Sequence, residues 1–295
     1  MTRPLRTALT LLGWLPLPAL HLLGWLLGSL LTALPNRFRR LTDWHLARCL
    51  PELDAMARAR LARTSLIESA KAICEAPAFW FGPRRRLRRW LVDPAALATL
   101  RAEHAAGRGV VMLTPHLGAW ELTSFFCAQV APITVLYKPQ KGAADAVIRA
   151  GRGRDPDVRP VPTTGGGVKA MLAALKRGEL VGLLPDHDPP EDSGTVFAPL
   201  FGVPANTMAL VAKLAARSGA PVWFIAAERL RWARGYRIHL RRAPEGIADA
   251  DPVRAATALN VGVEACIREW PGQYWWAYKR YRRRPPGDAD FYAGL

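Results

Sequence analysis

The stretch "GVVMLTPHLGAWELTSFF", residues 109–126, decides the fold. It opens with a short apolar run rich in β-branched residues, which is typical of a buried strand. After Pro115 the spacing of apolar residues becomes helical. His116 and Glu121 lie at this junction. A strand that leads directly into a helix predicts one unit of an α/β fold, with two polar residues where the strand ends.

The same alternation continues along the chain. Further strands are predicted at ITVLYK (133–138), LVGLLP (180–185), APVWFIAAERL (220–230) and, nearer an edge, YRIHLRR (236–242). Helices are predicted over 41–81, 120–130, 165–179 with Thr164 as a cap, 207–219 ending at Gly219, and 251–270 with Asp251 as a cap and Pro252 at the first position. We therefore expect an α/β fold with a mostly parallel central sheet flanked by helices. In such sheets the site lies at the carboxyl ends of the strands, where both His116 and Asp186 fall.

The N-terminal segment is strongly apolar. Residues 7–34 contain no Lys, Arg, Asp or Glu, and the stretch is longer than the ~20 residues that span a bilayer. Pro16 and Pro18 interrupt it, which allows a kinked span or a shallow re-entrant hairpin. A buried core helix is the alternative. We expect a membrane anchor over residues 1–36, with a membrane helix, and a globular domain over residues 37–295.

Composition narrows the possible partners. The chain of 295 residues has 41 Lys and Arg against 24 Asp and Glu, a net charge of +17. Such a chain attracts nucleic acid, anionic lipid or acidic proteins. The segment RRRLRRW (84–90) fits either a lipid-facing surface or a solvated helix face. The four cysteines form no CxxC pair, so neither a zinc ribbon nor a disulfide framework is indicated, and a reducing compartment fits.

The spacing of His116 and Glu121 restricts their chemistry. Five residues of helix separate two side chains by ~140°, so the pair cannot share one helix face as a metalloprotease pair does. With His116 in a loop and Glu121 in the first helical turn, they could act as a general base and the carboxylate that orients it. The sequence has no GxSxG motif, and such a dyad can deprotonate a substrate hydroxyl directly. For the run Asp186-His187-Asp188, a metal site is disfavoured because consecutive side chains point in different directions.

With its neighbours included, HLGAWE (116–121) resembles the H-x4-D/E motif of glycerolipid acyltransferases. More closely, it is similar to that of the lipid A late acyltransferase family, the Kdo-lipid IVA lauroyl and myristoyl transferases. The resemblance continues in YKPQK (137–141), GRGR (151–154), LLPDHD (183–188), VFAPLFGVPANT (196–207) and PGQYWWAYKRYRRRP (271–285). It covers nearly the whole chain. Two departures are Lys138, where Arg is usual, and Ala277-Tyr278-Lys279, where His-Arg is commoner.

This resemblance implies a glycerolipid-acyltransferase-like fold and an inner-membrane enzyme whose catalytic domain faces the cytoplasm. The enzyme would move a fatty acyl chain from acyl carrier protein to a hydroxyl of a lipid A precursor, without a covalent intermediate. His116 would be the general base and Glu121 would orient it, while Arg152, Arg154 and Asp186 would bind substrate or support the site. No metal, no cofactor and no nucleic acid is expected. The acidic carrier protein and the phosphates of lipid A precursors both suit an Arg-rich surface.

Two alternatives stay open. One keeps the chemistry but changes the acceptor to a glycolipid, an aminolipid or a lysophospholipid. The other is a basic module that binds membranes or nucleic acid without catalysis, for which Trp275, Trp276 and Tyr278 would stack bases instead of forming an interfacial or core cluster. Substitution of His116 separates catalysis from binding alone.

Overall fold

A computed structural model of the chain describes residues 3–140, 142–190 and 194–295. Its described residues form a six-stranded sheet of order β3-β2-β4-β1-β7-β8 and a separate two-stranded hairpin, β5-β6. The strands are β1 (Val110–Leu113), β2 (Ile133–Tyr137), β3 (Val158–Pro162), β4 (Leu180–Leu183), β5 (Thr195–Leu200), β6 (Val203–Met208), β7 (Val222–Arg229) and β8 (Tyr236–Arg242). Every neighbouring pair in the larger sheet is parallel except β7 with β8, which is antiparallel. The predicted mostly parallel sheet, with 236–242 at its edge, is confirmed.

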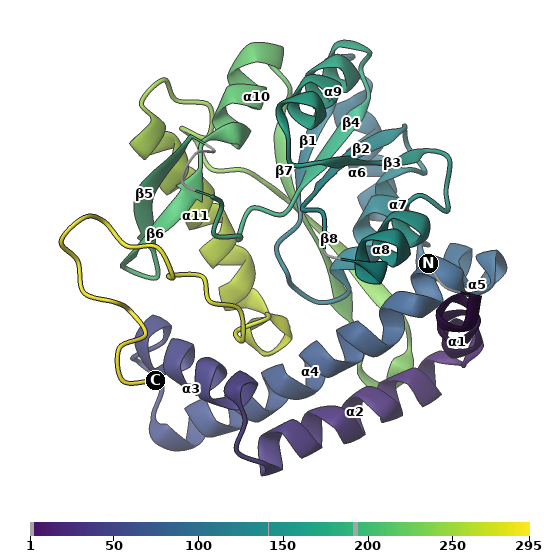
Figure 1. Ribbon diagram of the computed structural model, residues 1–295. Coiled ribbons are helices and arrows are strands. Elements are labelled where there is room, and N and C mark those ends of the chain that lie inside the picture. The colour runs from purple at the N-terminus through teal and green to yellow at the C-terminus, as the bar shows by residue number, and fades with distance from the viewer. Residues whose placement is uncertain (1–2, 141, 191–193) are drawn as a thin grey trace.

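Helices cover both faces of this sheet (Figure 1). They are α1 (Arg3–Trp14), α2 (Leu17–Ala33), α3 (Arg37–Cys49), α4 (Ala55–Phe81), α5 (Arg84–Trp90), α6 (Pro94–His104), α7 (Thr123–Cys127), α8 (Ala143–Arg152), α9 (Gly165–Lys176), α10 (Leu210–Ser218) and α11 (Pro252–Glu269). Because successive side chains of a strand point to opposite faces of the sheet, alternate residues of β1 pack against the helices on either side. Val111 and Leu113 join one buried cluster with α9, α10 and α11. Val110 and Met112 join another with α5, α6 and α7.

Several predicted helix ends are confirmed. The side chain of Thr164 accepts a hydrogen bond from the Gly167 amide, and that of Asp251 accepts one from Val253. Gly219 ends α10 in the left-handed conformation (φ +65°). The predicted helix over 41–81 is instead two helices, because the chain turns between Cys49 and Ala55 around Pro51.

Strand β3 and helix α8 are among the elements that were not predicted. Strand β3 reads VRPVP, and its two prolines argue against a strand in the middle of a sheet. It is tolerated because β3 is an edge strand that pairs only with β2 among the described strands. Helix α8, which carries Arg152, precedes it. The segment 196–207 forms most of the β5-β6 hairpin.

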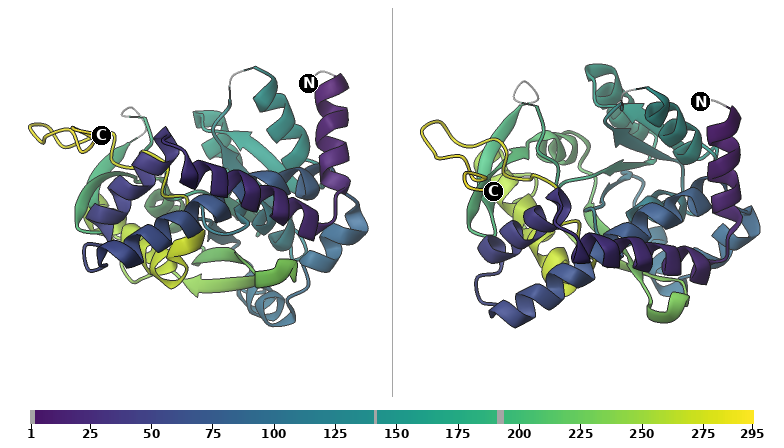
Figure 2. Two further views of the ribbon diagram at one scale, coloured as in Figure 1. Left: turned by 90° about the horizontal axis from the view of Figure 1, so that it is seen from below. Right: turned by 60° about the horizontal axis from the view of Figure 1, so that its bottom comes forward.

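The N-terminal segment is divided between α1 and α2, which meet at an angle of 110°. Within the described ranges, no helix taken singly has the length and apolar character needed to cross a membrane, whereas the bent pair passes that test. Helix α2 lies along α4 and underneath the sheet domain in Figure 1, and Figure 2 shows the same packing from below. The position of the N-terminal segment against α4 is therefore a feature of the fold.

Candidate active site

His116 and Asp186 meet at the carboxyl ends of β1 and β4, which are parallel neighbours. Nδ1 of His116 lies 3.0 Å from Oδ1 of Asp186, and the His116 amide donates to Oδ2 at 2.9 Å. An ionised carboxylate only accepts hydrogen bonds, so Nδ1 carries the proton and Nε2 of a neutral imidazole has the free lone pair. The His116 side chain keeps 18% of its surface exposed, against 1% for Asp186. This arrangement is that of a reachable base held by a buried carboxylate.

The ionisation of Asp186 is set by two opposing effects. Its burial would by itself raise the pKa of the carboxyl. The charge and hydrogen bonds of His116 outweigh this and hold the pKa well below its usual range. Asp186 therefore stays ionised at neutral pH.

Glu121 was predicted to orient His116, but the hydrogen bonds of its carboxylate go to other residues. It lies in a short 3-10 helix, Trp120–Leu122, directly after the His116 loop, so the predicted loop-then-turn placement is confirmed. Its carboxylate, however, is held by Arg152, which donates from Nε at 2.9 Å and from Nη2. Trp80 Nε1 donates to the same carboxylate at 3.3 Å. The planar guanidinium matches a carboxylate with two parallel hydrogen bonds, and the carboxylate hydrogen-bonded to the His116 ring is that of Asp186.

The Glu121–Arg152 pair is almost fully buried, with 11% and 13% of the side chains exposed. Burial opposes the charge on each partner, but their mutual attraction is stronger: the pKa of Glu121 is lowered and that of Arg152 is raised. Both groups are therefore charged. Arg152 is the last residue of α8, and nothing in the local pattern of the sequence predicts that it would reach Glu121.

Arg154 lies apart from this ion pair. Its Nη1 donates to the backbone carbonyl of Phe79 at 2.7 Å, near the end of α4. Burial lowers its pKa, and the neighbouring charge of Arg84 adds to that effect. In the structure Arg154 ties the loop after α8 to α4, and the substrate contact expected for it stays a prediction.

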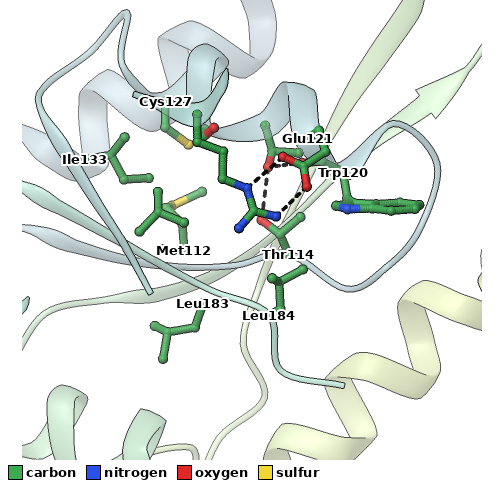
Figure 3. A pocket seen from close by; sticks show the side chains of 13 residues that line it. Met112, Thr114, Trp120, Glu121, Cys127, Ile133, Leu183 and Leu184 are labelled. Carbon is green, nitrogen blue, oxygen red and sulfur yellow. Dashed lines mark hydrogen bonds and ion pairs between the residues drawn. The ribbon is translucent and has the colours of Figure 1, made fainter. Parts of the chain in front are cut away.

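A narrow cavity lies beside the ion pair, between the sheet and α7 (Figure 3). Glu121 and Arg152 line it together with Trp120. The rest of its lining is mostly apolar and consists of Met112, Thr114, Thr123, Ser124, Cys127, Ile133, Val135, Gly182, Leu183 and Leu184. Burial raises the pKa of the Cys127 thiol to about 12, so this thiol stays protonated and is a wall of the cavity, not a nucleophile.

Four rings surround the imidazole of His116. The ring centroids of His187, Trp120, Trp275 and Tyr278 lie 4.6, 5.4, 6.3 and 6.4 Å away. Burial, followed by the charge of His116, lowers the pKa of His187 to about 3, so His187 is neutral at physiological pH. Sequence reasoning did not place these four residues in the site.

The C-terminal segment holds the His116 loop in position. The Trp275 amide donates to the His116 carbonyl at 3.1 Å, and the Gly118 amide donates to that of Gln273 at 3.0 Å. Gly118 has φ +61°, and a Cβ there would lie 2.2 Å from the Ala227 carbonyl oxygen. Only glycine meets both requirements. The signature at 271–285 was noticed in the sequence, but its contact with the His116 loop was not.

The three residues of Asp186-His187-Asp188 serve different neighbours. Asp188 is buried and accepts hydrogen bonds from Arg283 Nη1 at 2.8 Å, Arg282 Nε at 3.2 Å and Asn206 Nδ2 at 2.9 Å. Across residues 3–140, 142–190 and 194–295, no group of three or more His, Cys, Asp or Glu side chains is arranged to hold a metal ion. Asp188 fixes the end of the chain to the β4 loop.

Comparison with known proteins places this chain in a family. A family model described as "Bacterial lipid A biosynthesis acyltransferase" matches residues 6–283. This chain belongs to the bacterial lipid A biosynthesis acyltransferase family. It is 30% identical over 276 residues to the lipid A biosynthesis lauroyltransferase of Escherichia coli (strain K12). The aligned residues cover 92% of this chain and 88% of that protein. It is 28% identical over 282 residues to the lipid A biosynthesis palmitoleoyltransferase of the same strain, covering 94% and 90%.

The family membership identifies this lipid A biosynthesis acyltransferase as an enzyme that transfers acyl groups. The names of the two Escherichia coli relatives specify different acyl groups, lauroyl and palmitoleoyl, at nearly equal identity to this chain. The acyl group therefore does not follow from similarity. The resemblance carried by HLGAWE and the segments after it is confirmed.

Proposed function

We propose that this acyltransferase moves a fatty acyl chain from the thioester of acyl carrier protein to a hydroxyl of a lipid A precursor. The observation that carries the proposal is the pairing of His116 Nδ1 with buried Asp186, which leaves Nε2 as the acceptor nitrogen of a reachable imidazole. The family and the names of the relatives support the class of acceptor.

In the proposed mechanism, Nε2 of His116 takes the proton of the acceptor hydroxyl while the hydroxyl oxygen attacks the thioester carbonyl. The new C–O bond forms as a tetrahedral intermediate, which collapses with cleavage of the C–S bond. The imidazolium returns its proton to the departing thiolate. Asp186 stabilises the imidazolium through Nδ1. The thiolate of a thioester is a good leaving group, so the step needs no acyl-enzyme intermediate.

Glu121 acts in this proposal through Arg152, as a positioning residue. It accepts hydrogen bonds from Nε and Nη2 of Arg152. A guanidinium has five N–H donors, so Arg152 keeps others for a carbonyl oxygen or a phosphate of the substrate. The apolar walls of the adjacent cavity suit the start of an acyl chain. Arg154 and Asp186 complete the proposed set, as a supporting residue and as the orienting carboxylate.

We further propose that residues 1–36 attach the enzyme to the inner membrane and that residues 37–295 form the catalytic domain, facing the cytoplasm. The bent pair α1–α2 is the segment whose length and composition suit attachment. The net charge of +17 favours both anionic lipid and the acidic carrier protein as partners. No nucleic acid partner is proposed.

The test is a transfer assay with purified protein in detergent. The enzyme is incubated with acyl-carrier-protein thioesters and a tetra-acylated lipid A precursor, and mass spectrometry detects a product heavier by one acyl chain. We expect product from the wild type and from His104→Ala, a control on α6, but almost none from His116→Ala. Undiminished product from His116→Ala would contradict the mechanism. Product formed only with a glycolipid, aminolipid or lysophospholipid would move the proposal to that acceptor.

A further inference from the structure

Helix α2 is fixed along its length to the globular domain. Its buried face consists of Leu17, Leu20, His21, Gly24 and Gly28. A Cβ at Gly24 would lie 2.5 Å from Lys71 Cα, and one at Gly28 would lie 2.3 Å from Ile67 Cα, so the backbones of α2 and α4 are in contact. The contact position on α4 moves backward along the chain, from 71 to 67, as that on α2 moves forward from 24 to 28, so the two helices are antiparallel.

A buried ionic network strengthens this attachment. His21 Nε2 of α2 lies 3.0 Å from Glu75 Oε2 of α4, and Arg229 of β7 donates to the same carboxylate from Nε at 3.0 Å. The Tyr236 hydroxyl donates to it as well, at 2.8 Å. Helix α2 is thus joined to α4 and to the sheet by buried polar and charged groups.

The opposite face of α2 is apolar too, yet it is exposed. Its outward side chains include Leu22, Trp25, Leu26 and Leu30, each at least 43% exposed. A soluble helix packed on one face normally presents polar residues on the other. An exposed apolar strip of this length indicates that something covers it.

A second apolar group projects beside this strip. The turn between β7 and β8, Arg231–Ala233, carries Trp232, which is 86% exposed. Trp232 and Ala233 have φ of 60° and 53°, in the left-handed region that side-chain-bearing residues rarely adopt. An open groove is lined by Leu22 and Trp25 of α2 on one side and by Trp232 on the other. The turn lies next to α2 in both Figure 1 and Figure 2.

Arginines border this apolar surface. The first acidic residue of the chain is Asp43. Exposed arginines lie in the first two turns of α1, at the start of α3 and on both sides of Trp232; they are Arg3, Arg6, Arg37, Arg39, Arg40, Arg231 and Arg234. Apolar side chains enclosed by cationic ones match an anionic phospholipid surface, where Trp lies at headgroup depth.

We propose that α2 and the β7–β8 turn form one membrane-contact face, on which the protein lies with α2 parallel to the plane of an anionic bilayer and Trp232 as a second insertion point. The inference rests on the membrane attachment proposed above and specifies its geometry. An upright α2 would carry Arg63 and Lys71 of the attached α4 to the same depths in the hydrocarbon, where charged side chains are costly. With α2 in the plane, α4 stays on the aqueous side.

The test measures depth at single labelled positions. The native cysteines, Cys49, Cys74, Cys127 and Cys266, are free and buried, so an introduced cysteine can be labelled selectively with an environment-sensitive fluorophore. The variants are Leu22→Cys, Leu26→Cys, Leu30→Cys and Trp232→Cys, with Val253→Cys at the start of α11 as the control. Full-length protein is bound to phosphatidylethanolamine–phosphatidylglycerol vesicles that contain lipids with quenchers at the headgroup or deep in the acyl chain.

We expect the three α2 labels and the label at 232 to report one shallow depth, about 5–10 Å into the headgroup and acyl boundary, with the control label unquenched. A steady change of depth from position 22 to position 30, about 12 Å for an upright helix, would overturn the in-plane orientation. If the labels on α2 are quenched and the label at 232 is not, Trp232 is not part of the membrane-contact face. If the labels are shielded from water but are not quenched by lipid, and the protein self-associates, the face would instead be a contact with a second copy of the chain.

A functional variant gives an independent check of the same face. Trp232→Glu should lower partition onto these vesicles by about tenfold or more, because a charge replaces an inserting ring, whereas Val253→Glu should not change it. Equal partition of both variants would contradict the role of Trp232. Neither measurement uses substrate, so a wild type that binds in the plane but yields no acylated product would overturn the proposed function alone.

Discussion

Both oxygens of the Asp186 carboxylate are engaged by one residue: Oδ1 by the imidazole Nδ1 of His116 at 3.0 Å and Oδ2 by its backbone amide at 2.9 Å. This double contact fixes the ring and the loop together. The two residues are adjacent because β1 and β4, which precede them, are parallel neighbours. Catalysis should therefore depend on Asp186 nearly as much as on His116.

Asp186→Asn should lower kcat by about 10³–10⁴, since loss of the orienting carboxylate in a comparable triad has an effect of this order by allowing the wrong tautomer. KM should change much less. Steady-state kinetics and circular dichroism on the purified variant measure both effects. Asp157→Asn, an exposed residue before β3, is the control. A folded Asp186→Asn enzyme with kcat within tenfold of the wild type would exclude Asp186 from the mechanism.

Arg152→Lys should lower kcat by about 10²–10³, the range found for loss of one donor to a developing oxyanion. Lysine keeps the charge but not the planar fork that binds Glu121 with two hydrogen bonds. Arg149→Lys, one turn earlier on α8 and exposed, should be neutral. Equal kinetics for the two variants would show that charge alone suffices at position 152.

Gly118→Ala should destabilise the protein by at least ~1–2 kcal/mol, the cost of a left-handed conformation for a residue with a Cβ, and should also abolish transfer. The added Cβ must displace the Ala227 carbonyl oxygen from a distance of 2.2 Å. Gly107→Ala is a matched control, because Gly107 has φ +74° but no atom near the added Cβ. Thermal unfolding of both variants separates the conformational cost, which they share, from the clash.

Acid should weaken the attachment of α2 through Glu75. Burial alone would raise the pKa of this carboxyl, but Arg229 and His21 lower it from 4.5 to about 2. A lowered pKa means that the contribution to stability is complete above pH 4.5 and is lost as the pH falls toward about 2. Glu75→Gln should flatten this dependence and cost up to ~3–5 kcal/mol at neutral pH, because buried Arg229 loses one of its two carboxylate partners and keeps only Glu68.

Urea unfolding in detergent, followed by circular dichroism between pH 7 and pH 3, measures this effect. Glu52→Gln, on the surface before α4, is the control and should leave the curve almost unchanged. An acid dependence that is the same in Glu75→Gln and in the wild type would show that other carboxylates determine it.

The sequence predicted those features that depend on neighbours along the chain. The apolar runs at β1, β2, β4 and β7, the caps Thr164 and Asp251 and the loop position of His116 all follow from local spacing. Asp186 was selected because it follows a strand. The partner of each carboxylate could not be predicted in this way. Arg152 reaches Glu121 from α8, a helix that was not predicted and that precedes a proline-containing edge strand. The choice between Asp186 and Glu121 as the orienting carboxylate depends on which strands are neighbours in the sheet.

The hydrogen bond from Trp275 to the His116 carbonyl also has a consequence for the order in which the enzyme matures. The residues proposed to attach to the membrane, 1–36, are synthesised before the segment that completes the wall around His116. A growing chain can therefore reach the bilayer while its base is still unsupported. In the proposed function, competence to react with an acyl donor is then acquired only after residues 271–285 are made, when the N-terminal segment can already lie on the membrane.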